Sequence, residues 1–413
     1  MESLLAEKIK YVVGLDLGSS KICAVICEIN ETEGLDLVGF GSTESKGLSR
    51  GVVVNLDAAA AVIKQSVEEA ERAAETVVES VFVGVSGEHV KSFNSRGAVS
   101  ISTDNREISV EDVELVIDRA KEAISLPSDV KIVHMIPQAF VVDGQEGIKE
   151  PLGLLGGHLE VGCHVITASN LAHQNVVTAV NRAGVVVNDT ILQQLASAES
   201  TLSNDDKELG VAIIDIGGGT TDLAVFTQGA LRHTFILPLA GDQITNDIAV
   251  GLRTTIPEAE RIKRKYGCAL PKLIPEEVSF SVSSVGGRKP KSIDKRILCE
   301  IVQARMEEIL LLIQEEIKHV GFDRKLGAGL VLTGGTAQLE GVVELAEEKI
   351  DLPVRLGTPI GLDKMEAVLQ SSAYSTAIGL VLYGYRTHFR TITKVNTNRN
   401  LFSRIWSSLK NQS

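Results

Sequence analysis

The stretch Asp215-Ile216-Gly217-Gly218-Gly219-Thr220-Thr221-Asp222 lies between two short apolar runs, residues 211–214 and 223–226. This pattern predicts two strands joined by a tight glycine turn. Three glycines let several backbone N–H groups converge on one anion, and the two threonines add hydroxyl donors. The two aspartates have the chemistry to hold a hydrated Mg²⁺ beside a phosphate. On this motif alone, an ordinary hairpin with solvated aspartates is the alternative.

A second copy of the pattern lies near the start of the chain. A mostly apolar run, residues 11–15, leads into Asp16-Leu17-Gly18-Ser19-Ser20-Lys21, and another strand is predicted over 22–29. Asp16 and Asp215 occupy the same place in their hairpins. This similarity indicates two related half-domains, each offering one phosphate hairpin to a shared cleft. Lys21 would balance phosphate charge there, and a solvated lysine at the start of a strand is the alternative.

The bulk properties set the class of protein. A chain of 413 residues is too long for one simple core, so two or more domains are expected. The net charge of −13 argues against broad nucleic-acid binding. The five scattered cysteines form no CxxC pair, which favours a reducing cytoplasm over a disulfide framework. We expect neither a secretory signal nor a membrane-spanning segment.

Two further features follow the second hairpin along the chain. Gly241 precedes a predicted helix, so it either lets the helix start at a ligand phosphate or forms a plain strand-to-helix turn. Thr333-Gly334-Gly335-Thr336 ends a strand predicted over 327–332, with a helix expected from Ala337. Glu260 and Lys263 lie three apart on one helical face, where they either belong to the same site or form a surface ion pair.

Capping residues and apolar spacing predict the helices. Asp57 is expected to cap a helix that runs to about residue 76, and Asn170 a helix that ends at Gly184. Residues 203–207 are expected to form a polar connection at a domain boundary. A long helix over about 292–319 is expected to bury an apolar stripe. The stripe consists of Ile297, Ile301, Ile309 and Ile313.

Residues 88–164 differ from the rest of the chain, because they contain short strand-like pieces and one helix but no phosphate motif. Ser109 and Asp112 have the spacing of a capping box at the start of that helix. We expect this block to be a small α+β insertion outside the cleft.

The C-terminal tail is basic on an acidic protein, since no Asp or Glu follows Glu366. Residues 386–398 are expected to form a polar tether to an amphipathic helix. Its apolar face consists of Leu401, Phe402, Ile405, Trp406 and Leu409, flanked by Arg404 and Lys410. Such a helix is typical of weak, reversible binding to an anionic membrane surface, and a terminal helix packed on the body is the alternative. A row of these helices on a polymer would bind firmly.

Together these turns resemble the actin, heat-shock-chaperone and sugar-kinase superfamily over nearly the whole chain. The resemblance implies a duplicated α/β ATPase fold with ATP between its halves and Mg²⁺ oriented through water by Asp16 and Asp215. It also implies a set of residues that hold ATP. These are Gly18, Ser19, Ser20, Lys21, Gly217, Gly218, Gly219, Thr220 and Thr221 at the phosphates, Glu260 and Lys263 at the ribose and adenine edge, and Gly241, Gly334, Gly335 and Thr336 nearby. Gln193 falls where actins position the attacking water, which implies at most slow hydrolysis.

Within the superfamily, the chain resembles the FtsA family of bacterial cell-division proteins. The insertion, the segment 284–288 and the tail carry this likeness. It implies a protein that polymerises on the cytoplasmic face of the bacterial inner membrane at the division site, anchors the FtsZ ring and recruits later divisome membrane proteins. Anionic lipid, other copies of the chain and the FtsZ C-terminal tail are the implied partners, with no nucleic acid. The tail of FtsZ would dock on four basic residues, which are Arg288, Lys291, Arg296 and Arg305.

The resemblance divides the chain into nine segments. The first half comprises residues 1–87, 165–204 and 370–385, with the inserted subdomain at 88–164. The second half comprises 205–244, a subdomain at 245–326, and 327–369. The linker is 386–398 and the membrane helix 399–413.

The rival interpretation is an enzyme of the same superfamily, such as a sugar or acid kinase, because a fold alone does not define a reaction. A kinase needs a catalytic carboxylate aimed at an acceptor hydroxyl, and no clear candidate occurs. A chaperone is disfavoured because no substrate-binding domain follows. The related cell-shape and pilus-assembly proteins are closer rivals.

Overall fold

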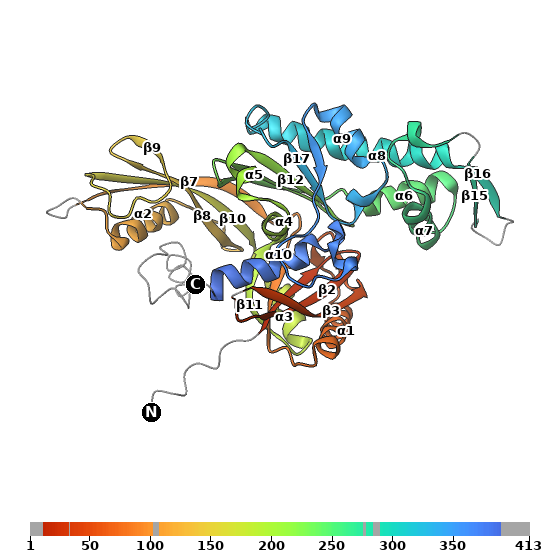
Figure 1. The fold of residues 1–413 in the computed structure, drawn as a ribbon, viewed down its shortest axis with the longest axis horizontal. Helices are drawn as coiled ribbons and strands as arrows, with labels where there is room; N and C mark the ends of the chain where they lie inside the picture. Colours follow the sequence, from red (N-terminus) through yellow and green to blue (C-terminus); the bar gives the residue numbers. More distant parts are fainter. Residues whose placement is uncertain (1–10, 33, 102–106, 276–277, 284–289, 390–413) are drawn as a thin grey trace.

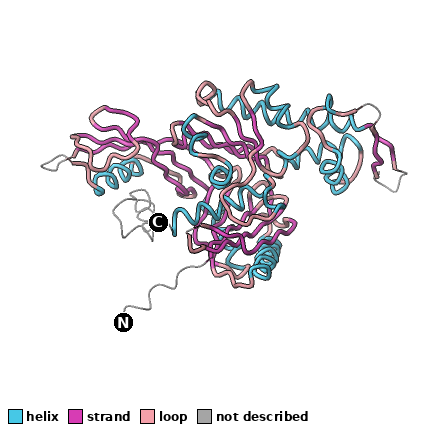
Figure 2. The backbone as a smooth tube through the Cα atoms, in the orientation of Figure 1, coloured by secondary structure: helices cyan, strands magenta, loops and turns pink. Residues whose placement is uncertain are grey.

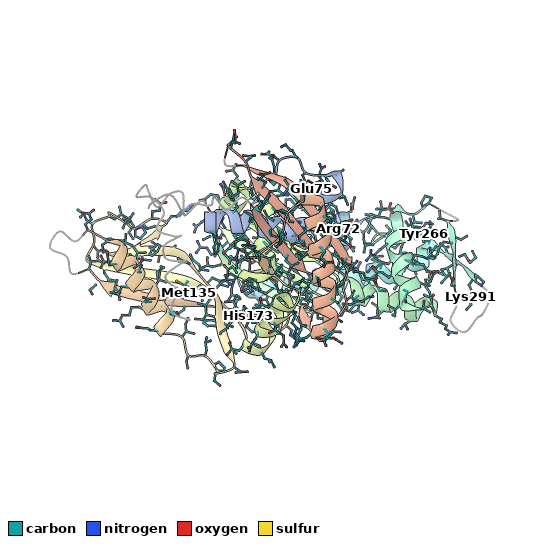
Figure 3. All side chains as sticks on the ribbon, turned by 90° about the horizontal axis from the view of Figure 1, so that it is seen from below. Arg72, Glu75, Met135, His173, Tyr266 and Lys291 are labelled. Carbon is teal, nitrogen blue, oxygen red and sulfur yellow. The ribbon has the colours of Figure 1, made fainter. Side chains whose placement is uncertain are left out.

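The computed structural model describes residues 11–32, 34–101, 107–275, 278–283 and 290–389. Two five-stranded sheets form its centre, and two smaller lobes extend from them along the longest axis (Figures 1 and 2). One lobe carries β7–β10 and α2, and the other carries α6–α8 with β15 and β16. In Figure 3, Met135 lies in the lobe on the left and Lys291 near the far end of the lobe on the right.

The first-half sheet has the strand order β11-β6-β1-β2-β3. Its strands are β1 (Tyr11–Leu17), β2 (Lys21–Ile29), β3 (Leu35–Glu44), β6 (Ser80–Val85) and β11 (Val186–Leu192). β1, β2 and β3 pair antiparallel with one another, whereas β6 runs parallel to both β1 and β11. α1 (Leu56–Ala74) and α3 (Asn170–Arg182) cover one face. α4 (Gln193–Thr201) and α10 (Ser375–Gly384) cover the other.

The second-half sheet repeats this topology, with the order β14-β13-β12-β17-β18. Its strands are β12 (Val211–Ile216), β13 (Thr221–Thr227), β14 (Ala230–Leu237), β17 (Leu330–Thr333) and β18 (Val354–Leu356). β12, β13 and β14 pair antiparallel, and β17 pairs parallel to β12 and β18. The repeated order confirms the prediction of two related halves. Both glycine hairpins, β1–β2 and β12–β13, take the central place in their sheets.

The inserted block is an independent α+β lobe, as predicted. Its elements are β7 (Lys91–Ser100), α2 (Val110–Glu122), β8 (Val130–Val142), β9 (Gln145–Ile148) and β10 (His158–Ser169). The sheet is antiparallel in the order β7-β10-β8-β9, and α2 packs on it around its own apolar core. Ser109 and Asp112 form the predicted capping box at the start of α2.

The second lobe and the connections complete the described fold. The lobe contains α6 (Gly241–Leu252), α7 (Ile256–Tyr266), β15 (Ser279–Val282), β16 (Lys291–Asp294) and α8 (Lys295–His319). The connections contain β4 (Leu48–Ser49), β5 (Val52–Val53), α5 (Asn204–Leu209) and α9 (Val342–Ile350). Short 3₁₀ turns span Pro271–Leu273, Thr336–Gln338, Ala367–Gln370 and Ser372–Tyr374, and a π-helical turn spans Tyr385–Phe389.

Two predicted N-terminal helix caps were wrong. Asn55, not Asp57, caps α1, and its side chain accepts from the Ala58 N–H (3.0 Å). Ser169, not Asn170, caps α3. Competing polar residues one or two positions apart caused both errors, since any of them has a suitable side-chain oxygen.

Three further predictions were wrong because the tertiary structure, rather than the local sequence pattern, decides these helix boundaries and buried positions. Residues 204–209 form the short helix α5 rather than a connection. A 3₁₀ turn occupies Thr336–Gln338, and α9 begins only at Val342. Ile309 and Ile313 are buried in α8 as expected, but Ile297 is 47% exposed because it lies at the solvent-facing start of that helix.

The five cysteines are all described, and each is buried and free of disulfide bonds. No helix among the described residues is both long and apolar enough to cross a bilayer. The predicted membrane residues, from Leu401 to Lys410, lie outside the described residues. Arg386, where the tether is expected to begin, belongs to the π-helical turn and pairs with Glu199 (3.0 Å).

Candidate nucleotide site

The turns of the two hairpins lie against each other between the halves. A Cβ placed on Gly218 would lie 3.2 Å from the Cβ of Ser20, and one on Gly219 would lie 2.5 Å from the Ser19 hydroxyl. Among the described residues, none accepts a hydrogen bond from the backbone N–H of Ser19, Ser20, Gly218 or Gly219. These N–H groups are therefore available to an anion entering between the turns.

Three buried aspartates lie behind these turns. Asp215 and Asp222 face each other across the β12–β13 pairing, and Asp16 lies at the equivalent place on β1. The Gln193 side chain donates to Asp16 (3.1 Å).

The other two carboxylates, Asp215 and Asp222, accept hydrogen bonds from hydroxyl groups. Ser197 donates to Asp215, as does Thr376 (2.9 Å). Ser86 donates to both oxygens of Asp222 (2.8 and 3.0 Å).

Burial makes this cluster hard to ionise. Burial raises the pKa of Asp16, Lys21 opposes this shift and Asp215 adds to it, and together they place the pKa at about 7. Burial, together with Asp215 and Asp16, raises the pKa of Asp222 to about 8. The pKa of Asp215 is raised by burial too, against the hydroxyls of Ser197 and Thr376 and the charge of Lys21. A cation placed among these groups would favour their charged forms, so the donor set suits a hydrated divalent ion.

This chemistry fits Mg²⁺ held through water beside a phosphate. The described residues contain no group of three or more His, Cys, Asp or Glu side chains arranged to bind a metal directly. The roles assigned to Asp16 and Asp215 at Mg²⁺ stay predictions.

Lys21 is already engaged by groups at the start of α10. Its ammonium donates to the carbonyl oxygen of Ala373 (2.6 Å) and lies 3.1 Å from the centre of the Tyr374 ring. Burial lowers the pKa of Lys21, although Asp16 and Asp215 oppose that shift. The side chain thus fastens the first hairpin to the start of α10, and it would have to leave Ala373 to reach a phosphate.

Lys263 and Glu260 form a pair that is not a simple surface contact. The Lys263 ammonium is buried, and it contacts Glu260 (2.7 Å), the Gly241 carbonyl (2.9 Å) and the Thr245 hydroxyl (2.8 Å). Although burial raises the pKa of Glu260, Lys263, Thr245 and Arg264 together hold it below its usual value. Arg264 also donates to the Ser20 hydroxyl (3.2 Å), so α7 reaches the first hairpin.

Gly241 and Thr336 are fixed by the second hairpin. The Gly241 N–H donates to the Gly217 carbonyl (3.1 Å), and the Thr336 hydroxyl donates to the same oxygen (2.6 Å). A side chain at Gly241 would collide with Thr336. The first N–H of α6 is therefore used within the protein, so Gly241 is required by packing rather than by a ligand alone.

The remaining predicted residues differ in how crowded they are. Gly334 has φ +91°, and a Cβ there would overlap the Asp215 carboxylate. Gly335 has room, since a Cβ there would lie 3.8 Å from its nearest neighbour, the Cβ of Ala373. The hydroxyls of Thr220 and Thr221 donate to Asp222 (3.2 Å) and the Leu239 carbonyl (2.7 Å), so neither is free as a phosphate donor in this arrangement.

The structure brings together the residues of both hairpins, Gly241, Glu260, Lys263 and the turn at Gly334. The proposed basic docking residues lie elsewhere, on the second lobe. Lys291 and Arg296 are exposed, whereas Arg305 already pairs with Asp247 (2.7 Å) and Glu308. Arg288 lies outside the described residues.

Sequence reasoning missed the hydroxyl groups that hold the aspartates. Ser197 and Thr376 come from α4 and α10, and no local pattern marks them. Ser86 had a weak signal, because Ser86-Gly87 directly follows the strand Ser80–Val85 and is itself a strand-to-glycine turn.

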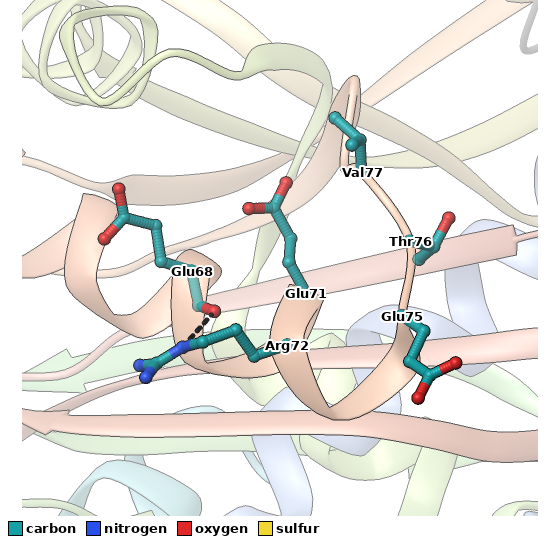
Figure 4. A pocket seen from close by; sticks show the side chains of 6 residues that line it. All are labelled: Glu68, Glu71, Arg72, Glu75, Thr76 and Val77. Atoms are coloured by element: carbon teal, nitrogen blue, oxygen red, sulfur yellow. Dashed lines mark hydrogen bonds between the residues drawn. The ribbon is translucent and has the colours of Figure 1, made fainter.

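A surface hollow at the C-terminal end of α1 is lined by Glu68, Glu71, Arg72, Glu75, Thr76 and Val77 (Figure 4). It lies at the opposite end of α1 from the first hairpin. Ala70 and Ala74 pack near Gly39, whereas the turn residue Lys21 pairs with Glu44 at the other end of β3. The hollow is therefore not part of the nucleotide site.

The duplicated sheets with facing hairpins define an actin-like ATPase fold, and solved structures of that class match. The PilM protein of the "PilM-PilN type IV pilus biogenesis complex" superposes with a TM-score of 0.65 at 20% identity, covering 90% of this chain and 98% of that one. MreB5 of Spiroplasma citri bound to ADP gives a TM-score of 0.53 at 16% identity, covering 95% and 99%. These likenesses concern the fold alone.

Sequence comparison identifies the family. Residues 212–379 match the family "Cell division protein FtsA", and residues 87–167 match "SHS2 domain inserted in FTSA". The chain is 46% identical to FtsA of Pseudomonas aeruginosa over 91% of its own length and 89% of that protein. It is 39% identical to FtsA of Escherichia coli K12 over 92% and 91%. The chain belongs to the FtsA family of cell division proteins, as its motifs predicted.

Proposed function

We propose that this protein binds Mg-ATP, polymerises on the cytoplasmic face of the inner membrane, anchors the FtsZ ring there and recruits later divisome membrane proteins. One observation carries the proposal: a member of the FtsA family has three buried aspartates behind two facing glycine turns. Gly18, Ser19 and Ser20 of the first turn, with Gly217, Gly218 and Gly219 of the second, would hold the phosphates. Bound Mg²⁺ would supply the charge that offsets the phosphates and the aspartates.

ATP would act mainly as a clamp between the halves. Asp215 belongs to the second half, but Ser197 and Thr376 hold it from α4 and α10. α10 packs on the first-half sheet, whereas α4 lies between the two sheets and contacts both. Arg264 spans the same boundary in the other direction, to Ser20. A ligand that binds both turns would therefore favour one relative position of the halves. Gln193, bound to Asp16, is suited to slow hydrolysis at most.

The second lobe offers a surface for the acidic tail of FtsZ. Lys291 and Arg296 are exposed, and neither pairs with an acid among the described residues. Ile297 lies beside Arg296 with 47% of its surface exposed, which adds an apolar contact. Arg305 is a weaker candidate, because a partner carboxylate would have to displace Asp247.

The membrane attachment rests on the amphipathic pattern of residues 399–413. Liposome pelleting tests it directly. Trp406→Glu should remove the protein from the pellet because it places a charge on the apolar face, whereas ATP binding should survive. Leu209→Glu is a matched control, since Leu209 is 67% exposed on the body of the protein. Unchanged pelleting of the Trp406 variant would refute the anchor.

Electron microscopy on lipid monolayers tests the function as a whole. With Mg-ATP, the intact chain should form filaments on anionic lipid, and Asp215→Asn should not. Filaments that form equally well without nucleotide would contradict the clamp. A failure of the intact chain to form any filament with Mg-ATP would contradict polymerisation.

A further inference from the structure

Ser86 lies at the edge of the cleft where the first half meets the second. It directly follows β6, which runs parallel to β1 with Gly14 opposite Phe82 and Leu15 opposite Val83. Continuing that register places Ser86 level with Gly18, at the first phosphate turn. Ser86 is 2% exposed, so it is buried at this boundary.

The partner of Ser86 belongs to the other half. Its hydroxyl lies 2.8 and 3.0 Å from the two oxygens of Asp222, on β13. Asp222 is 3% exposed and faces Asp215 in the hairpin. Among the described residues, Thr220 is the other group that donates to Asp222, at 3.2 Å and from the same hairpin. The shorter contact that orients this carboxylate therefore comes from across the cleft.

The backbone around Ser86 is tightly held. Gly51 has φ +76°, and a Cβ there would lie 2.7 Å from the carbonyl of Ser86. The Gly51 N–H in turn donates to the hydroxyl of Ser19 in the first phosphate turn (3.4 Å). Ser86 is thus connected to the first turn through Gly51 and to the second through Asp222.

Ser86 is also the root of the inserted lobe, because β7 begins at Lys91. The lobe lies beside the second-half sheet (Figure 1). Ser92 donates to the Thr234 carbonyl (2.8 Å) and Gln138 to the Leu231 carbonyl (2.9 Å), both on the edge strand β14. β14 pairs with β13, the strand that carries Asp222. A shift of Asp222 relative to the first half would therefore reach the lobe both at its root and at its docked face.

We propose that Ser86 is a positioning residue that holds Asp222 across the cleft for the cation of Mg-ATP and couples occupancy of that site to the inserted lobe. The inference deepens the proposed nucleotide function and rests on it. Ser86 touches neither phosphate nor metal directly. It acts by fixing a carboxylate that faces Asp215 and by carrying the change to the strand that follows.

The test is nucleotide affinity with Mg²⁺ and with EDTA, measured on the full chain with a fluorescent ATP analogue. Ser86→Ala should lose roughly 10-fold or more of the Mg²⁺-dependent gain, because a hydrogen bond to a charged group is removed. Its affinity in EDTA should not change. Ser86→Cys keeps the shape but replaces the hydroxyl with a larger and weaker donor, so it should show the same loss. Ser66→Ala removes another buried hydroxyl, bound to the Gly41 carbonyl (3.0 Å), and should leave the gain intact.

A double variant shows whether Ser86 acts through Asp222. In an Asp222→Asn background, Ser86→Ala should add no further loss, because its target has already been neutralised. Additive losses would overturn the positioning role. Hydrogen exchange is the second readout. Mg-ATP should increase protection of β7 and β8 in the unmodified chain and in Ser66→Ala, but not in Ser86→Ala.

The outcomes separate this inference from the proposed function. If the unmodified chain shows no Mg²⁺-dependent binding, the proposed function fails and the inference fails with it. If the unmodified chain shows that gain and Ser86→Ala keeps it, the inference alone is overturned. Equal protection of β7 and β8 in Ser86→Ala would overturn the coupling.

Discussion

The two glycine hairpins share a topology but differ in what holds them. In the first, Asp16 receives a hydrogen bond from Gln193, which follows β11 of the same half. In the second, Asp215 receives hydroxyls from α4 and α10, and Asp222 receives one from Ser86. The carboxylate of the first hairpin is thus held from within its own half, and Arg264 of the second lobe reaches the Ser20 hydroxyl in its turn. In the second hairpin, by contrast, both carboxylates receive hydrogen bonds from across the cleft.

This difference shows how a duplicated fold becomes asymmetric. Both halves present an aspartate at the same place in a strand, but the buried carboxylates of the second hairpin depend more directly on how the halves are positioned, because they are hydrogen-bonded across the boundary. A change in the relative position of the two halves would therefore first alter the hydrogen bonds to Asp215 and Asp222. The second hairpin is the better candidate for sensing whether the cleft is closed, and the first for a fixed platform.

The largest effect is expected when Asp215, the aspartate of the second hairpin, is neutralised. Asp215→Asn should reduce Mg-ATP binding to below detection, because it removes charge from the cation site and disturbs contacts from two helices. Isothermal titration calorimetry would measure it. Asp118→Asn, an exposed aspartate on α2, is the matched control. Tight Mg-ATP binding by the Asp215 variant would refute the proposed site.

Asp16, the aspartate of the first hairpin, should make the stability of the protein depend on pH. Its pKa is raised from 3.8 to about 7, so the stability tied to its protonated form is complete below pH 3.8 and is lost as the pH rises to about 7. Asp16→Asn cannot titrate. Its stability relative to the unmodified chain should therefore grow by about 1.4 kcal/mol per pH unit across that window, reaching roughly 4 kcal/mol above it.

Urea unfolding between pH 5 and 8, without Mg²⁺ or nucleotide, would measure this difference. Saturating Mg-ATP should reduce it, because the bound cation favours ionised Asp16 in the folded state. Parallel pH curves for the two proteins would contradict the raised pKa of this buried carboxyl.

The sequence predicted the parts of the site that carry a local signature. Asp16, Gly18 and the run Asp215–Asp222 lie at the ends of buried strands or in the turns that join them, and strand-to-glycine turns fix their neighbours in space. Ser197, Thr376 and Ser86 could not be found in this way. A buried hydroxyl looks like any serine or threonine until the fold brings a carboxylate to it.

The same limit applies at Gly241 and explains the error at Ile297. The sequence left open whether the start of α6 faces a phosphate or forms a plain turn, and in the structure its first N–H donates to Gly217. Ile297 has helical spacing to Ile301, yet it lies in solvent because the first turn of α8 buries its neighbours Leu298 and Cys299 instead. Spacing defines a helical face, whereas tertiary packing decides which part of that face is covered.

The buried lysines extend the comparison to smaller effects. Lys263→Met should destabilise the protein by about 2 kcal/mol, because the partly exposed Glu260 loses a close partner and two hydrogen bonds disappear. Lys21→Met should lower the free energy of unfolding by less than about 1 kcal/mol, because it removes one hydrogen bond to Ala373. Burial also disfavours the charged form of Lys21, which limits what the native side chain contributes. Thermal unfolding of both variants would measure the difference. An equal or larger loss for Lys21→Met would contradict the assigned partners.

The smallest effect is expected at the glycine turn after β17. Gly335 has φ −66° and ψ −35°, which alanine adopts readily, and a Cβ there would be 3.8 Å from its nearest neighbour. Gly335→Ala should therefore change the free energy of unfolding by no more than about 0.5 kcal/mol. Gly334→Ala is the contrasting variant, because φ +91° and the overlap with Asp215 make it strongly destabilising.

Nucleotide affinity gives Gly335→Ala its functional meaning. If the base or α-phosphate packs on this turn, as the resemblance implies, the added methyl group should weaken Mg-ATP binding while leaving the melting temperature almost unchanged. An unchanged affinity would remove Gly335 from the site and leave Gly334 with a purely structural role beside Asp215. The turn after β17 would then serve the second hairpin rather than the ligand, and the asymmetry between the halves would rest on the hairpins alone.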